Sequence, residues 1–299
     1  MTRVQLDDRV AAIARALDIP VDRARMLISS VIVAQMLPDG AVVKGGIGVK
    51  LRLGEVGTRA TKDMDLAVRD RANFLGEFNQ RLGVGWGTVP PSKGALKKNP
   101  DAPPRLAFSG RARQGDQAQP DGVPTEYLMD PYFVTLHFMG TSWARVTVEV
   151  GHDEIGGIKQ ADHPTEIADQ IVAIGKVLGF GELAAVALIS IEQQIAQKIH
   201  AATEPNSQRA HDLVDLQLLW HAGTVGGQGL DLPMLTDRCR RTFAYRKAHA
   251  WPPTAAMSDI LEALYQKAKD EASQADLLAE NLAQACAWLN ARIEEIDTR

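Results

Sequence analysis

Two aspartates separated by one residue, Asp63 and Asp65, stand in the segment KDMDLAV. Met64, Leu66 and Val68 alternate with them, and this period of two predicts a β-strand. Side chains two apart on a strand point the same way, with Cα atoms roughly 6.5–7 Å apart, so both carboxylates can converge on one ion. Two such charges about 4 Å apart repel by roughly 4 kcal/mol at an effective dielectric near 20. Mg²⁺ removes that repulsion and binds one or two carboxylates together with substrate phosphates. The alternative is the solvated outer face of an edge strand.

A pair of glycines, Gly45 and Gly46, precedes this strand in the segment VVKGGIGVKLRL. If a helix begins at Ile47, its free N–H groups and its dipole can hold the phosphates of a nucleotide. The segment IGVKLRL is compatible with either a helix or a strand. The G-x-x-x-x-G-K-[ST] pattern is missing, which excludes a P-loop. The alternative is an ordinary turn, in which paired glycines only permit a positive φ.

A third carboxylate, Glu149, lies on a later segment, ARVTVEV, that also alternates. If this strand lies beside the Asp63 strand, Glu149 can deprotonate an attacking hydroxyl or complete a metal site. The alternative is an exposed strand residue paired with Arg145.

Three further charged residues fall in the helical part of the chain. Lys198 lies off the apolar stripe of an amphipathic helix, where a lysine is usually solvated. Asp212 and Asp215 lie on one side of the next helix. Asp212 could be only an N-cap, whereas Asp215 stands within the helix between apolar neighbours.

Composition limits the possible function classes. The 299 residues carry a formal net charge of −4, so binding to nucleic acid would need a local basic patch. Two segments supply one, the basic loop at 93–113 and the run RCRRTFAYRKAH at 238–249, in which Phe243 and Tyr245 could stack bases. Both segments could also be ordinary solvated faces.

Other features indicate where the protein works. The two cysteines fit neither a metal site nor a disulfide framework, so we expect free thiols in a reducing cytosol. The longest apolar stretch is too short and too polar for a bilayer. The charged N-terminus lacks a signal-peptide core. We therefore expect a cytoplasmic protein with no membrane partner.

The order of the predicted elements indicates an α+β fold. Helices are expected over 6–38 and 72–82, strands over 64–68, 132–138 and 144–150, and long loops or short strands over the Gly- and Pro-rich residues 83–124. From about residue 180 the periodicity is helical to the end, with helices at 232–247, 257–272 and 274–296. We expect an α+β domain with a mixed sheet at 1–175 and a helical domain at 176–299 that completes the active site.

Three separated segments, VVKGGIGVKLRL…TRATKDMDLAV, QQIAQKIHAA and RAHDLVDLQLL, together resemble the AbiEii/AbiGii-type nucleotidyltransferase toxins of bacterial type IV toxin–antitoxin systems. These proteins belong to the polymerase-beta-like nucleotidyltransferase superfamily. The pattern is a K-G-G-[TS] turn, an [RS]-x-[TS]-x-D-[IL]-D strand, a helix with K-x-x-A, and R-x-[KR]-D-x-x-D-L. The match extends from residue 41 to about 220.

The resemblance implies roles for the matching residues. Lys44, Gly45, Gly46, Thr61 and Lys198 would bind the nucleotide. The metal ligands would be Asp63 and Asp65 holding Mg²⁺, with Mn²⁺ possible, and Asp212 or Asp215 would be a late essential acid.

It also implies a reaction and partners. NTP would supply a nucleotide to RNA, namely to the 3′ acceptor end of tRNA, which would stop translation and growth. A cognate antitoxin encoded nearby would oppose this. Two alternatives remain: a small-molecule or protein hydroxyl as the acceptor, and a non-catalytic nucleotide-binding regulator.

Two residues depart from the pattern. Ile47 stands where the family has Thr or Ser, so phosphate contact would depend more on backbone N–H groups. His211 replaces a basic residue before Asp212, which would make the charge there pH-dependent.

Overall fold

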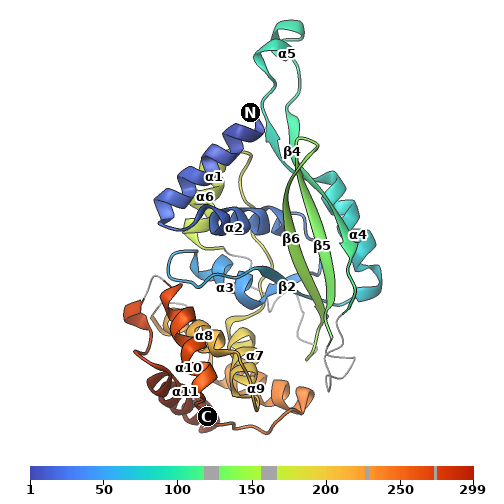
Figure 1. Cartoon of the computed structure of the whole chain (residues 1–299). Helices are drawn as coiled ribbons and strands as arrows, with labels where there is room; N and C mark the ends of the chain where they lie inside the picture. Colours follow the sequence, from blue (N-terminus) through green and yellow to red (C-terminus); the bar gives the residue numbers. More distant parts are fainter. Residues whose placement is uncertain (118–127, 156–166, 226–228, 273–274) are drawn as a thin grey trace. The chain divides into compact units, whose positions relative to one another are not determined.

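The computed structural model describes residues 1–117, 128–155, 167–225, 229–272 and 275–299. Contacts divide the chain into two compact units (Figure 1): the first comprises Met1–Val43, Lys62–His152 and Thr165–Ala187, and the second comprises Lys44–Thr61, Asp153–Pro164 and Leu188–Arg299. This grouping concerns packing and not where an independently folding domain ends. The domain boundary between residues 175 and 176 therefore stays a prediction.

The first unit is built on a six-stranded sheet. Its strands are β1 (Val42–Lys44), β2 (Asp63–Val68), β3 (Trp86–Val89), β4 (Arg105–Gln114), β5 (Asp130–Phe138) and β6 (Thr141–His152), in the order β1-β2-β6-β5-β4-β3. Strand β2 pairs with β6 in parallel, whereas β5 pairs with β6 and with β4 in antiparallel fashion. The sheet is therefore mixed, and the predicted α+β fold class is confirmed.

Alternation decides which sheet face is buried. Val146, Val148 and Val150 of β6 are at most 1% exposed, and Met64 and Leu66 of β2 lie beside them in register and are fully buried. The helices of this unit are α1 (Arg3–Leu17), α2 (Val21–Ala34), α4 (Arg71–Val84), α5 (Lys93–Lys98) and α6 (Asp169–Leu178). Helix α2 packs on β6 and α4 on β4. The alternate positions of β2 and β6, which carry the charged residues, are consequently left on the other face.

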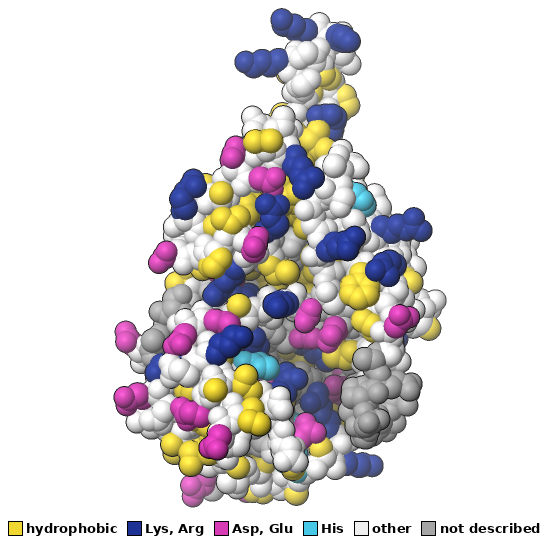
Figure 2. Space-filling model, in the orientation of Figure 1, with side chains coloured by type: hydrophobic (Ala, Val, Ile, Leu, Met, Phe, Trp, Pro, Cys, Tyr) yellow, Lys and Arg dark blue, Asp and Glu magenta, His cyan; other side chains and the backbone are white. Residues whose placement is uncertain are grey.

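The segment expected as long loops is more ordered than its composition predicts. Besides the short strand β3 it contains α5 and the ten-residue strand β4, so the prediction of a basic loop at 93–113 was wrong. Figure 2 shows Lys and Arg side chains at the tip formed by α5, where no helix residue is buried.

The second unit is helical, with α3 (Gly45–Leu53), α7 (Ile191–Thr203), α8 (Ala210–Val225), α9 (Leu232–Arg246), α10 (Asp259–Asp270), a short 3₁₀ turn η3 (Ala275–Leu277) and α11 (Leu282–Asp297). Its core is formed mainly by α7, α8, α9 and α11, and Val49 of α3 joins it. None of the helices in the described part of the chain combines the length and apolar character that a membrane span requires.

A buried ion pair fixes the loop that leads from α3 towards β2. Lys50 donates to both carboxylate oxygens of Glu55 at 2.8 and 2.7 Å and to Thr58 Oγ1 at 3.1 Å. The side chains of Lys50 and Glu55 are 3% and 0% exposed. Breaking such a pair would leave an uncompensated buried charge, so the path of the chain between Gly54 and Thr61 is strongly specified.

Candidate nucleotide and metal site

The three predicted carboxylates lie on one face of two neighbouring strands in the first unit. Asp65 of β2 is opposite Glu149 of β6 in the parallel register, and Asp63 is opposite Thr147. Adjacent strands are about 4.8 Å apart, so the side chains of Asp65 and Glu149 start from neighbouring backbone positions. Asp63 is exposed, and Asp65 and Glu149 are half-buried. The predicted adjacency of the two strands is confirmed.

The chemistry of this donor set fits a hard divalent cation. The available donors on this face of β2 and β6 are carboxylate oxygens, which suit Mg²⁺ or Mn²⁺. Within the described ranges, no group of three or more His, Cys, Asp or Glu residues is arranged to hold a metal by itself. A cation bound by two carboxylates and completed by substrate phosphates needs no such group.

The glycine turn opens a helix, as the nucleotide-binding hypothesis requires, but two residues earlier than expected. Helix α3 begins at Gly45, and its N-cap is Lys44 in an extended conformation without a side-chain cap. Gly45 has a φ of 61°, a conformation that glycine adopts without a steric cost. The first N–H groups of the helix are therefore not capped by a side chain of Lys44.

Gly46 is required by close packing. A Cβ added there would lie 2.5 Å from Oγ1 and 2.9 Å from Cβ of Thr61, so no other residue type fits without a shift. Ile47 is 1% exposed and its side chain belongs to the interior. The missing hydroxyl at this position is thus replaced by a core residue.

The turn is tied to the helices that carry the other predicted residues. Gln194 of α7 donates from Nε2 to the carbonyl of Gly45 at 2.9 Å. Nζ of Lys44 lies 3.9 Å from Glu154, whose carboxylate also accepts from Arg246 at 2.8 Å. Lys44 is 6% exposed, and its ammonium group faces a carboxylate of the same unit.

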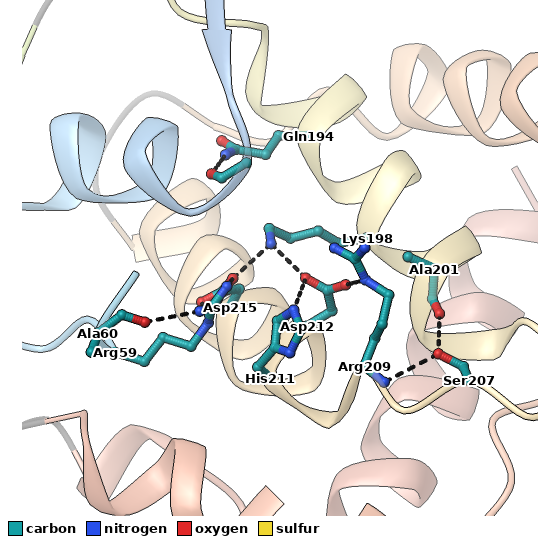
Figure 3. Close-up of polar contacts among 11 residues, drawn as sticks. Arg59, Ala60, Gln194, Lys198, Ala201, Ser207, Arg209, His211, Asp212 and Asp215 are labelled. Atoms are coloured by element: carbon teal, nitrogen blue, oxygen red, sulfur yellow. Dashed lines mark hydrogen bonds and ion pairs between the residues drawn. The ribbon is translucent and has the colours of Figure 1, made fainter. Parts of the chain in front are cut away.

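Lys198 joins the two late aspartates (Figure 3). Its ammonium group donates to Asp212 at 2.7 Å and to Asp215 at 2.6 Å, and the side chains of all three residues are at most 6% exposed. The alternative interpretation of Lys198 as a solvated surface lysine is therefore wrong. Asp212 is the third residue of α8 rather than its N-cap, and its burial within ion pairs explains why the residue is acidic.

Two arginines complete this cluster and were not predicted. Arg59 donates from Nε and Nη2 to Asp215, with the shortest contact at 3.0 Å. Arg209 donates from Nε to Asp212 at 2.6 Å. Arg59 also stands close to the turn, since its Nη2 would be 3.4 Å from a Cβ at Gly46. Arg59 belongs to the segment TRATKDMD, so its place in that motif was the available signal.

The electrostatics of the cluster favour the charged forms. Burial lowers the pKa of Lys198, but Asp212 and Asp215 outweigh it and hold that pKa above its ordinary value. Burial likewise opposes ionisation of the two aspartates, and Lys198 with Arg209 or Arg59 brings their pKa values below the ordinary value. Lys198, Arg59 and Arg209 carry three positive charges beside the two negative charges of Asp212 and Asp215.

His211 is uncharged at neutral pH. Burial, assisted by Arg59 and Arg209 against the opposing effect of Asp212, lowers its pKa to about 4. The expected pH dependence of its charge therefore lies well below the physiological range.

Most basic side chains described for the second basic segment, 238–249, form contacts within the protein. Arg246 pairs with Glu154, Arg240 with Asp297, and Arg241 donates to the carbonyl of Ile155. Phe243 is 3% exposed and belongs to the core of the second unit, so of the two aromatic residues considered for stacking on bases, this one is buried instead.

The predicted residues are thus divided between the two units. The carboxylates Asp63, Asp65 and Glu149 belong to the first unit, and the described set Lys44, Gly45, Gly46, Thr61, Lys198, Asp212 and Asp215 belongs to the second. Each set is brought together within its own unit.

Comparison with known proteins gives a family and a fold. The family model "Nucleotidyl transferase AbiEii toxin, Type IV TA system" matches residues 27–289. No curated protein gives a significant match. Among solved structures, MenT4, a nucleotidyltransferase toxin from Mycobacterium tuberculosis H37Rv, is similar with a TM-score of 0.50 and 16% identity over 99% of this chain and 88% of that one.

Two Helicobacter pylori structures are more distant. JHP933 matches with a TM-score of 0.40 and 12% identity over 93% of this chain and 94% of that chain. A protein described as a putative nucleotidyltransferase matches with a TM-score of 0.39 and 13% identity over 90% and 94% of the two chains.

Proposed function

Because this chain belongs to the AbiEii nucleotidyltransferase toxins of type IV toxin–antitoxin systems, we propose that it transfers a nucleoside monophosphate from an NTP to the 3′-hydroxyl of RNA, with tRNA as the acceptor. The observation that carries this proposal is the placement of Asp63, Asp65 and Glu149 on one face of the paired strands β2 and β6. The family membership confirms the predicted resemblance. It also implies an antitoxin partner. The cytoplasm, where NTP and tRNA are found, is the proposed location.

In this proposal the carboxylates of the first unit bind the cation and activate the acceptor hydroxyl. Asp63 and Asp65 would hold Mg²⁺ or Mn²⁺, which when bound neutralises phosphate charge and orients the reacting groups. Glu149 would accept the proton of the 3′-hydroxyl as its oxygen attacks the α-phosphate. The new P–O bond forms as the bond to the leaving pyrophosphate breaks.

Within the second unit, a separate group of residues is proposed to bind nucleotide phosphates. The N–H groups at Gly45 and Gly46 begin α3 and can donate to phosphate oxygens. Lys198 uses two of its three N–H donors on Asp212 and Asp215 as far as the described contacts go, which leaves one for a phosphate oxygen. Thr61 and Lys44 border the same turn. Asp212 and Asp215 keep Lys198 charged and oriented, so we assign them positioning roles.

The proposal is tested by incubating the protein with total RNA, Mg²⁺ and each α-labelled NTP in turn. We expect label in the tRNA fraction with at least one NTP, and no label when EDTA replaces Mg²⁺. Label transferred to protein or to a small molecule instead, with none in RNA, would contradict the choice of acceptor. Metal-dependent NTP binding without any transfer would contradict the enzymatic function.

A further inference from the structure

The strand register places a continuous row of side chains across the first unit's sheet. Asp63 of β2 is paired with Thr147 of β6, Thr147 with Phe133 of β5, and Phe133 with Arg113 of β4. Register partners share a face of the sheet, because successive side chains alternate. The row therefore runs over three strand spacings, about 14 Å, from a predicted metal ligand to an arginine.

This face is open to solvent along the row. Asp63 and Arg113 are exposed, and Phe133 is 37% exposed although it is a large aromatic residue in a central strand. The opposite positions, such as Val134 and Val148, are fully buried. Phe133 therefore lies on the face opposite the buried core and is not one of the core residues.

The ring of Phe133 is held in a defined position. The guanidinium of Arg113 lies over it, 4.9 Å from the ring centroid. A Cβ at Gly115 would come within 2.5 Å of Cε2 of the ring, so glycine there leaves space for it. The ring and the guanidinium of Arg113 are therefore neighbours on the exposed face of the sheet.

The charges on this face are separated. A second row runs from Arg111 through Thr135 to Arg145, so three arginines lie on β4 and β6 beside Phe133. None of the three forms an ion pair with a carboxylate in the described ranges. The carboxylates Asp63, Asp65 and Glu149 lie on the same face, towards its β2 edge. Over β4–β6, Figure 2 shows Lys and Arg side chains next to hydrophobic ones, with acidic side chains below them.

We propose that this face binds the single-stranded end of the acceptor RNA, an inference that rests on the proposed function. Bases stack on aromatic rings and on guanidinium planes, which Phe133 and Arg113 provide. Arg111 and Arg145 neutralise backbone phosphates. The strand then leads across Thr147 to the carboxylates, where its 3′-hydroxyl would react. An apolar surface of a partner protein would fit this face less well, because the face carries three arginines around a single exposed ring.

The test measures the binding of a short, fluorescently labelled single-stranded RNA oligonucleotide. Fluorescence anisotropy gives the affinity at each of a series of salt concentrations. Phe133→Leu keeps an apolar side chain but removes the ring, and it should weaken binding about 5-fold to 100-fold, the range for one stacked base. The double variant Arg111→Gln/Arg145→Gln, which removes the two arginines assigned to phosphates, should reduce the magnitude of the slope of log K against log salt by about 1.4, since each single-strand phosphate contact contributes about 0.7.

The matched control is Lys97→Gln/Lys98→Gln on α5, which removes the same charge from another exposed part of the same unit. We expect its salt slope to equal that of the wild type. Equal losses in both double variants, a loss only in the α5 variant, or no binding by the wild type would each overturn the proposal. The proposal would also be overturned if the variants of this face lost antitoxin binding while they still bound RNA like the wild type. The assay contains no NTP, so a failure to transfer nucleotides would contradict the proposed function separately.

Discussion

At the residue scale, the ammonium group of Lys198 balances two carboxylates in the interior of the second unit. Asp212 and Asp215 accept from it at 2.7 and 2.6 Å, and Arg59 and Arg209 add further donors. In such a cluster every charge depends on its partners, because an unpaired buried charge is strongly unfavourable. Residues proposed to position a nucleotide therefore also stabilise the fold.

Lys198→Met should lower the free energy of unfolding by about 3–5 kcal/mol, the cost of breaking a buried pair. Urea unfolding measures this change. The control is Glu295→Gln, which breaks a pair with Arg292 whose side chains are about one-third exposed, and which should change stability by at most about 1 kcal/mol. Equal effects of the two substitutions would contradict the structural role of Lys198. Activity of Lys198 variants must accordingly be compared at temperatures where each is folded.

His200 of α7 is a buried histidine outside the proposed site. It is 2% exposed, and neither ring nitrogen has a hydrogen-bond partner in the described part of the chain. Burial, followed by the neighbouring Arg246 and His249 and against the opposing effect of Glu154, lowers its pKa to about 3. The unfolded chain therefore binds a proton near pH 6.5 that the folded chain does not bind until about pH 3.

Stability should consequently fall as the pH falls from about 6.5 towards 3, because the unfolded state holds more protons over this interval. His200→Phe removes this group and keeps a ring in the core, so the urea midpoint should drop less between pH 7 and pH 5 than in the wild type. Part of the drop remains, since the pKa of His211 is also lowered, to about 4, mainly by burial. His221→Phe on the exposed surface is the control. An unchanged drop in the His200 variant would refute this origin.

At the element scale, local pattern predicted the elements with clear periodicity. The strand bearing Asp63 and Asp65 and the helices α4, α9 and α10 were found where the alternation or the helical stripe predicted them, whereas the helix predicted over 274–296 begins only at Leu282. Their apolar faces are buried, so pattern and packing agree. The segment IGVKLRL was ambiguous because its helical state depends on contacts distant in sequence: Val49 joins the core of the second unit.

Strand β4 could not be predicted for the same reason. Its sequence, RLAFSGRARQ, contains few β-branched residues and several charges. It is a strand because it pairs with β5 from Phe108–Phe138 to Gln114–Tyr132. The ion pairs of α9 could not be predicted from the sequence either. Arg246 pairs with Glu154 and Arg240 with Asp297, and both partners lie far away along the chain.

The start of α3 gives a prediction at this scale. Gly46→Ala places a methyl group against Thr61, so the turn must move or the helix must lose its first residues, and both stability and NTP binding should decrease. Gly76→Ala in α4 is the matched change, because a Cβ there meets nothing within 4 Å. It should stabilise the protein by about 1 kcal/mol through helix propensity. Thermal unfolding and NTP titration compare the two variants, and a harmless Gly46→Ala would contradict the close packing.

At the scale of the whole molecule, the family and the α+β class followed from three short motifs in order. The motifs predicted Lys198, Asp212 and Asp215 as functional residues, and the structure shows that they contact one another. Arg59 and Arg209 stand in the same motifs but were not assigned a role, because their ion partners become evident only in the tertiary structure. The open face carrying Phe133 was missed because it depends on the register of four strands.

The central claim is that Asp63 and Asp65 serve nucleotide transfer and are not needed for folding. The most direct measurement is the transfer of label from an α-labelled NTP to tRNA by Asp63→Asn and Asp65→Asn, beside Glu77→Gln, which changes an exposed carboxylate on α4. Each aspartate variant should lose at least about a hundredfold in rate, comparable to the loss of one transition-state contact, with an unchanged unfolding midpoint, while Glu77→Gln keeps the wild-type rate. Wild-type transfer by both aspartate variants would contradict the account.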